Sequence, residues 1–111
     1  MGEPGFLLSR STPRFSFIAE AEVTSQSDGT RLVARVAELS SRGCYIDTIN
    51  PFPIGTQLRF RIRYACSVCE LPGKIIYNHS GFGMGVLFGD VPGPQRAVLD
   101  AWLGELAGKS C

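Results

Sequence analysis

The chain has 111 residues, of which 19% are charged, and a formal net charge of +1. This length fits one domain with one hydrophobic core. A net charge this small excludes a whole-molecule field that would hold the protein on nucleic acid or an anionic membrane, so electrostatic recognition must come from local clusters. Arg supplies nine of the 11 basic residues, which favours planar, bidentate contacts with phosphate, carboxylate or guanine.

Residues 1–13 lack hydrophobic periodicity and carry Gly, Pro, Ser and Thr, which predicts a flexible N-terminal arm before a domain at residues 14–108. The apolar stretch from Phe6 to Leu8 is far shorter than a signal-peptide core, and no other run approaches a membrane span. We therefore expect a cytoplasmic protein without membrane insertion. In that reducing compartment the cysteines are expected to be thiols; they are Cys44, Cys66, Cys69 and Cys111.

Alternating apolar residues predict a first strand from Phe15 to Val23, with Ile18 as the exception to the alternation. Residues 27–29 form a predicted hairpin turn in which Gly29 supplies a positive φ. A second strand follows from Thr30 to Leu39, and residues 40–43 break the pattern before a short third strand at residues 44–48.

The prolines in residues 50–55 predict a loop, because a central strand needs the N–H groups that proline lacks. A fourth strand follows at residues 57–64, with apolar side chains on one face and arginines on the other. The fifth, at residues 68–77, is interrupted at Pro72 and Gly73, where a bulge or an edge position is expected. The sixth covers residues 83–88.

After Pro94, which suits a first helical turn, apolar residues follow helical spacing to the end of the chain; they are Val98, Leu99, Trp102, Leu103 and Leu106. Six short strands and a terminal helix predict an all-β fold. We expect a six-stranded antiparallel β-barrel with a C-terminal α-helix that covers an open end or rim.

Two motifs stand out on this scaffold. The first is an R-x-x-x-R from Arg10 to Arg14, and the second runs E-L-S-S-R-G from Glu38 to Gly43. The arrangement resembles the PilZ domain family, whose signature is an R-x-x-x-R arm followed by [D/N]-x-S-x-x-G. The segment G-M-G-V-L-F at residues 83–88 and P-I-G at residues 53–55 are also similar to that family, and the resemblance covers residues 8–106.

The resemblance implies a receptor for the bacterial second messenger cyclic di-GMP, with no catalytic activity and no cofactor besides this ligand. Arginine contacts both phosphate oxygens and the guanine O6/N7 edge in bidentate fashion. The implied ligand residues are Arg10, Arg14, Glu38, Ser40 and Gly43. In this interpretation binding orders the arm and changes a surface that a separate protein recognises, for example in the pilus, flagellar or regulatory machinery.

Position 38 is Asp or Asn in the family and Glu in this chain. The longer side chain displaces the carboxylate by one methylene, which keeps a second hypothesis open: a PilZ-like adaptor that binds a protein and no nucleotide. Accessory ligand candidates are Arg35, Arg42 and Gly85, although solvated surface charge is the favoured interpretation of the two arginines.

Three other features have simpler interpretations. Arg59, Arg61 and Arg63 could meet nucleic acid, lipid phosphate or an acidic partner. Pairing across the sheet with Glu20, Glu22 or Glu70 on neighbouring strands is favoured, and no nucleic acid polymer is expected as a partner. Cys66 and Cys69 form a C-x-x-C without a companion pair at metal spacing, so a metal or redox protein is a remote alternative and no metal is expected. His79 lies in a turn-like stretch with no nucleophile or acid predicted beside it.

Overall fold

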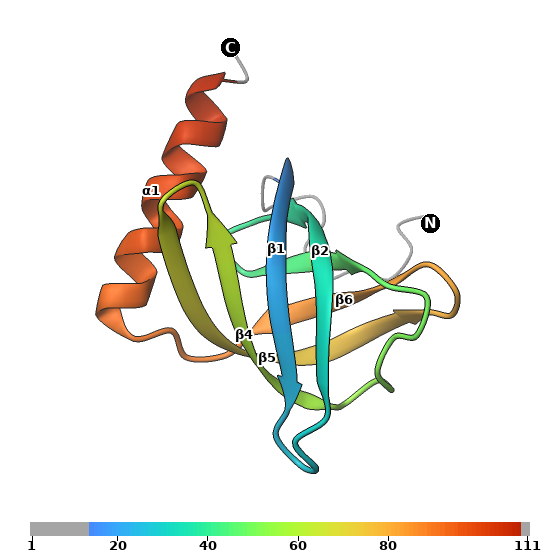
Figure 1. Ribbon diagram of the computed structural model, residues 1–111. Helices are drawn as coiled ribbons and strands as arrows, with labels where there is room; N and C mark the ends of the chain where they lie inside the picture. The colour runs from blue at the N-terminus through green and yellow to red at the C-terminus, as the bar shows by residue number, and fades with distance from the viewer. Residues whose placement is uncertain (1–13, 110–111) are drawn as a thin grey trace.

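The computed structural model describes residues 14–109, in which six antiparallel strands close into a barrel followed by one helix (Figure 1). The elements are β1 (Phe15–Ser25), β2 (Arg31–Leu39), β3 (Gly43–Asp47), β4 (Gln57–Tyr64), β5 (Ser67–His79), β6 (Gly83–Phe88) and α1 (Gly93–Lys109). Around the barrel the strands follow the order β1-β2-β3-β6-β5-β4, and β4 pairs with β1. The predicted fold class is confirmed.

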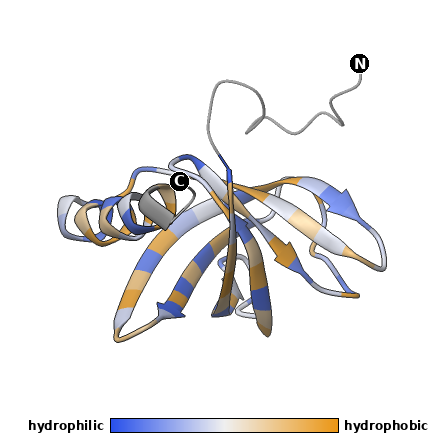
Figure 2. Cartoon of the chain, turned by 90° about the horizontal axis from the view of Figure 1, so that it is seen from above, coloured by the Kyte–Doolittle hydropathy of each residue, from blue (hydrophilic) through white to orange (hydrophobic). Residues whose placement is uncertain are grey.

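Strict alternation of side chains along β1 and β4 builds the core. Apolar side chains on one face of each strand are buried, whereas the charged side chains between them reach solvent, and the strands in Figure 2 show this as alternating hydrophobic and hydrophilic bands. The register between β1 and β2 shifts between Ser16 and Ala19. Ile18 lies within this shift and is 66% exposed, which agrees with its expected departure from the pattern.

The predicted turns are close to those observed. Gly29 has a φ of 75° in the β1–β2 turn, as expected for a glycine there. The predicted interruption of the fifth strand is corrected in one respect, because β5 runs without a break through Pro72 and its irregularity lies between Ile75 and Tyr77. The barrel is closed, so β5 is not an edge strand. Pro72 pairs with Arg59 of β4, and on its other side the β5–β6 ladder ends at Gly73, beyond which the Pro72 carbonyl accepts a hydrogen bond from the Gly89 N–H at 2.9 Å. The end of that ladder accommodates a residue without an N–H.

Helix α1 packs against β5 and β1 and covers one end of the barrel (Figure 1). Leu99 is fully buried and Trp102 is 4% exposed. The ring centroid of Trp102 lies 5.5 Å from that of Phe17 on β1 and 5.5 Å from that of Tyr64 on β4. The predicted apolar face of the helix is thus the face that closes the barrel.

No helix within residues 14–109 is both long and apolar enough to cross a membrane.

The C-x-x-C segment joins β4 to β5 in the predicted hairpin. Cys66 is exposed in the turn, Cys69 is buried on β5, and both are free thiols. The Cys69 Sγ donates a hydrogen bond to the backbone carbonyl of Gln95 at 3.4 Å. Burial raises the pKa of Cys69 to about 11 and raises the pKa of Cys44 further still. These environments suit structural thiols.

We expect Trp102→Ala to lower the free energy of unfolding by about 3–5 kcal/mol, because it removes the side chain that packs α1 on the barrel end and leaves a cavity. Glu105→Ala, at an exposed position of the same helix, should change it by less than about 0.5 kcal/mol. Urea denaturation monitored by far-ultraviolet circular dichroism, a signal that does not depend on the removed tryptophan, measures the free energy of unfolding of both variants. Equal losses in the two variants would contradict the assigned packing.

Under native conditions at pH 8, iodoacetamide should alkylate Cys66 at least about tenfold faster than Cys69 or Cys44, because the thiolate is the nucleophile and burial suppresses it. Peptide mass spectrometry after timed quenching separates the three sites. The same reaction in 6 M guanidinium chloride is the control, where the rates should converge. Rapid native labelling of Cys69 would show that its site is open.

Candidate functional site

The two sequence motifs meet where β1 begins and β2 ends. Arg14 immediately precedes β1, and Ser16 of β1 pairs with Glu38 of β2. This register brings the Arg14 Nη1 to 3.8 Å from the Glu38 Oε1, with the side chains 37% and 46% exposed. Both charged groups therefore remain accessible at the barrel surface while they face each other. Arg10 lies outside the described residues.

The β2–β3 turn is organised by the hydroxyl group of Ser40, which is fully buried. Its Oγ accepts hydrogen bonds from the backbone N–H groups of Arg42 at 3.2 Å and Gly43 at 3.1 Å, and it donates to the Gly43 carbonyl at 3.2 Å. One donor and two acceptor positions are the whole capacity of a hydroxyl. Ser40 thus holds the turn and has no capacity left for a further partner in this arrangement.

A row of partner residues crosses the outer face of the barrel from this corner. Glu38 on β2 pairs with Tyr45 on β3, Tyr45 pairs with Gly85 on β6, and Gly85 pairs with Tyr77 on β5. Paired residues project to the same face of a sheet, and the neighbours Met84 and Val86 are buried in the core. Gly85 therefore separates two tyrosines on the outer surface.

Tyr45 is fixed by a second aromatic group. Its hydroxyl lies 3.0 Å from the Nδ1 of His79, and the ring of His79 packs on that of Tyr77 with centroids 4.2 Å apart. Burial, together with the negative charge of Asp47, raises the pKa of Tyr45. A Cβ at Gly83 would lie 2.6 Å from the Tyr45 Cε2, so a glycine is needed beneath this ring.

These aromatic residues were not among the predicted site residues. Their signal in the sequence was weak, because Tyr45 and Tyr77 are 32 residues apart and only the pairing through β6 places them in one row. His79 was expected in a turn, and it is the last residue of β5. Its hydrogen-bond partner on β3 could not be inferred from neighbouring residues.

The three accessory ligand candidates have different surroundings in the structure. Arg35 forms an ion pair with Asp47, at 3.3 Å between the Nη2 and Oδ2 atoms, and Arg42 is exposed on the β2–β3 turn. Gly85 is buried within the row described above, and Gly43 is buried at the start of β3. Among the described glycines a positive φ occurs at positions 29, 55 and 81, so Gly43 does not use the left-handed region.

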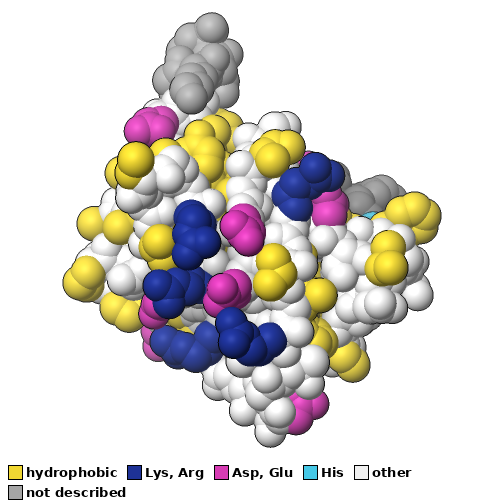
Figure 3. All heavy atoms as spheres, in the orientation of Figure 1, with side chains coloured by type: hydrophobic (Ala, Val, Ile, Leu, Met, Phe, Trp, Pro, Cys, Tyr) yellow, Lys and Arg dark blue, Asp and Glu magenta, His cyan; other side chains and the backbone are white. Residues whose placement is uncertain are grey.

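Two of the three arginines of the β4 ladder are paired with acidic side chains, as expected. Arg61 lies 3.4 Å from Glu70 of β5, and Arg63 lies 3.7 Å from Glu20 of β1. Glu22, also considered as a ladder partner, instead pairs with Arg31 at 3.1 Å. Figure 3 shows basic and acidic side chains interleaved on this face. Neutralisation across the sheet argues against a continuous anion-binding surface.

Within residues 14–109 there is no group of three or more His, Cys, Asp or Glu side chains that could hold a metal ion. His79 has a tyrosine hydroxyl as its hydrogen-bond partner. The corner formed by Arg14, Glu38 and the β2–β3 turn, with the adjacent tyrosine row, is the candidate site, because the described residues of both motifs meet there.

Comparisons with known proteins agree with this fold. The chain superimposes on the PilZ domain with c-di-GMP of YcgR from Escherichia coli with a TM-score of 0.72 at 15% identity, covering 92% of this chain and 94% of that one. The PilZ domain of CeSA from a cellulose-synthesizing bacterium gives 0.66 at 16% identity, with 89% and 99% covered.

The Bacillus subtilis inhibitor of motility, MotI/DgrA, gives a TM-score of 0.71 at 14% identity, with 92% of this chain and 51% of that chain covered. The chain therefore corresponds to about half of MotI. No curated protein sequence matches the chain significantly.

The family profile described as PilZ domain matches residues 8–105, which is most of the chain. PilZ domains form a family of cyclic di-GMP receptors, and they are receptor or adaptor domains without enzymatic activity. The profile, the closed six-stranded barrel and the terminal helix agree. The chain belongs to the PilZ domain family.

Proposed function

We propose that this protein binds cyclic di-GMP at the corner formed by Arg14, Glu38 and the β2–β3 turn. We further propose that a separate protein recognises the nucleotide-bound form. The observation that carries the proposal is the meeting of both signature motifs, with 3.8 Å between the Arg14 and Glu38 charged atoms. A guanidinium and a carboxylate side by side provide complementary partners for a phosphate and for the guanine N1–H and N2–H₂ edge.

The ion pair between Arg14 and Glu38 can be opened by a ligand. Its 3.8 Å separation exceeds hydrogen-bond length, and both side chains are more than a third exposed. Pairs of this kind contribute about 0–1 kcal/mol, whereas a bidentate contact to a base edge contributes about 1–3 kcal/mol. The nucleotide would thus replace a weak contact by two stronger ones.

Ser40 has an indirect role in this proposal. Its hydroxyl is fully engaged by the backbone of Arg42 and Gly43, so direct hydrogen bonding to guanine would require the turn to open. We assign it the task of holding the turn so that Glu38 on one side and Arg42 on the other have fixed positions. Gly43 and Gly85 are buried beside this corner, and in this proposal their missing side chains let a planar base come closer to the backbone once the neighbouring side chains move.

The output depends on a partner. We propose that Arg10 joins Arg14 on the ligand, and that the ordered arm forms a surface for another protein. MotI is described as an inhibitor of motility, so motility machinery is one class of partner to test. A cytoplasmic location is part of the proposal, in keeping with the free thiols of Cys44, Cys66 and Cys69.

A second candidate function is an adaptor that binds a protein and no nucleotide. It is favoured by one specific observation: Glu38 already faces Arg14, and the Ser40 hydroxyl is used within its own turn. The corner is therefore internally satisfied without a ligand. Calorimetric titration separates the two functions.

Titration of the wild-type protein with cyclic di-GMP should give saturable heat, and Arg14→Ala should weaken binding at least about tenfold, because a charge-assisted hydrogen bond contributes about 1.5–3 kcal/mol. Arg31→Ala is the matched control, since Arg31 is also an exposed, ion-paired arginine next to β1. It should leave the affinity within about twofold. Absence of heat at high micromolar nucleotide would select the adaptor.

Glu38→Asp tests the departure from the family pattern. The shorter carboxylate loses rotamer freedom and reach toward Arg14, and we expect about threefold to tenfold tighter binding of cyclic di-GMP. Glu38→Ala should weaken binding at least about tenfold, because no acceptor remains for the guanine edge. Unchanged affinity in both variants would remove Glu38 from the site.

A further inference from the structure

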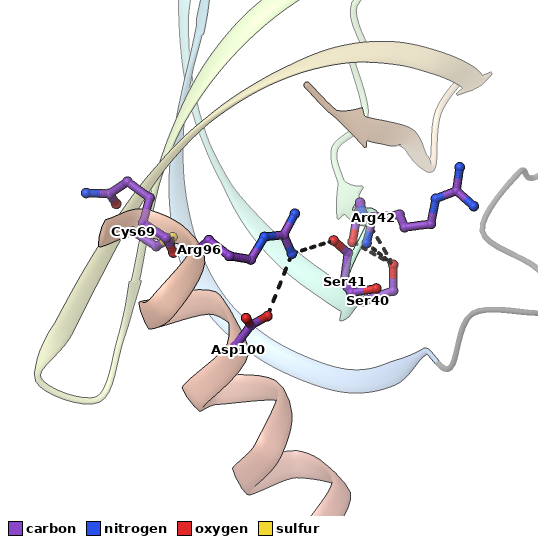
Figure 4. Close-up of polar contacts among 8 residues, drawn as sticks. Ser40, Ser41, Arg42, Cys69, Arg96 and Asp100 are labelled. Atoms are coloured by element: carbon purple, nitrogen blue, oxygen red, sulfur yellow. Dashed lines mark hydrogen bonds and ion pairs between the residues drawn. The ribbon is translucent and has the colours of Figure 1, made fainter. Parts of the chain in front are cut away.

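Helix α1 is joined directly to the β2–β3 turn by one side chain. The Arg96 Nη1 donates a hydrogen bond to the backbone carbonyl of Ser41 at 3.0 Å, across 55 residues of sequence. Figure 4 shows Arg96 extending from the helix to the turn. Ser41 stands inside the second signature motif, between Ser40 and Gly43, so the helix holds the segment that forms one wall of the proposed site.

The Arg96 side chain has a fixed direction. The Oδ1 of Asp100, one helical turn later, lies 3.7 Å from the same Nη1. The preceding residue anchors the helix to β5, because the Gln95 Oε1 accepts a hydrogen bond from the Glu70 N–H at 2.6 Å and its carbonyl accepts one from Cys69. The first turn of α1 thus contacts both β5 and the motif turn.

The β2–β3 turn has two functional sides. The Ser41 carbonyl points toward α1, whereas the Arg42 side chain points away from the helix in Figure 4. The backbone carbonyl of Arg42 accepts a hydrogen bond from the Phe88 N–H at 2.7 Å at the end of β6. The turn is therefore held by its own serine, by β6 and by Arg96, and Arg96 alone among these belongs to the helix.

We infer that Arg96 is a positioning residue that couples the nucleotide site on the β2–β3 turn to the docking of helix α1. This inference rests on the proposed function. Binding that restricts the turn strengthens the Arg96 contact and so holds the start of the helix more firmly. By reciprocity, a looser helix weakens nucleotide binding by the same factor. The docking of the helix on the barrel then depends on whether nucleotide is bound, as the arm does in the proposed function.

Removal of the Arg96 contact should not unfold the protein. Leu99 and Trp102 keep α1 on the barrel through buried apolar contacts, and Gln95 keeps its bonds to β5. The Arg96 side chain itself is 38% exposed. The loss is therefore confined to the link between helix and turn, which makes Arg96→Ala a usable probe.

The test is hydrogen exchange of wild type, Arg96→Ala and Arg31→Ala, with and without saturating cyclic di-GMP. Without ligand, Arg96→Ala should speed exchange of the Arg42 and Gly43 amides about threefold to tenfold. With ligand, residues 40–44 and 95–103 should both gain protection in wild type. In Arg96→Ala the turn should still gain it but the helix should not, and calorimetry should show about fivefold weaker binding. Arg31→Ala should match wild type.

The outcomes separate the coupling from the receptor function. If nucleotide protects residues 40–44 but leaves residues 95–103 unchanged in wild type, binding stands and the coupling is wrong. If residues 95–103 of Arg96→Ala gain as much protection with nucleotide as those of wild type, other residues couple the helix to the site and the role given to Arg96 is wrong. If nucleotide protects neither segment and gives no heat, the receptor function fails, and the coupling that rests on it fails as well.

Discussion

The geometry of the candidate site depends on one buried hydroxyl group. Ser40 is fully buried and uses its donor and both acceptor positions on the backbone of the β2–β3 turn. A serine in this place fixes the direction in which β2 ends and β3 begins, and it thereby fixes Glu38 and Arg42 on either side. Loss of this hydroxyl leaves the N–H groups of Arg42 and Gly43 without their acceptor. An unsatisfied buried N–H such as that of Gly43 costs about 1–3 kcal/mol.

The barrel adds the partners that this turn faces. The β1–β2 register sets Ser16 opposite Glu38 and so carries Arg14 to the same corner. The pairing of β3, β6 and β5 sets Tyr45 and Tyr77 on either side of Gly85. The helix closes this end of the barrel through Trp102 and contacts the turn through Arg96. The turn is thus contacted by β6 and by α1, and Arg14 lies beside Glu38 just before the turn begins.

Local patterns in the sequence predicted most of the fold. The alternation in β1 and β4 depends only on neighbouring residues, and the bounds of β4 and β6 agree with the prediction. Pro72 was harder to interpret, because whether a proline interrupts a strand depends on which of its sides is paired. The β6 ladder ends one residue away, and that information is not local.

The arrangement of the candidate site also depends on information that is not local in the sequence. Arg14 and Glu38 were chosen through the family motifs, and the register shows that they meet. The bonds of the Ser40 hydroxyl within its own turn were not predicted, since a motif gives residue types and no hydrogen-bond count. Tyr45 and Arg96 were not predicted as site residues because their hydrogen-bond partners are 34 and 55 residues away in the sequence. Only the folded chain brings these partners together.

A crystal structure of the complex with cyclic di-GMP locates the nucleotide directly. We expect that the Glu38 carboxylate turns from Arg14 to a guanine N–H edge, that Arg14 contacts the nucleotide, and that the Ser40 hydroxyl keeps its bonds to Arg42 and Gly43. A nucleotide bound elsewhere on the barrel, or a turn whose serine bonds have broken to admit the base, would contradict this expectation.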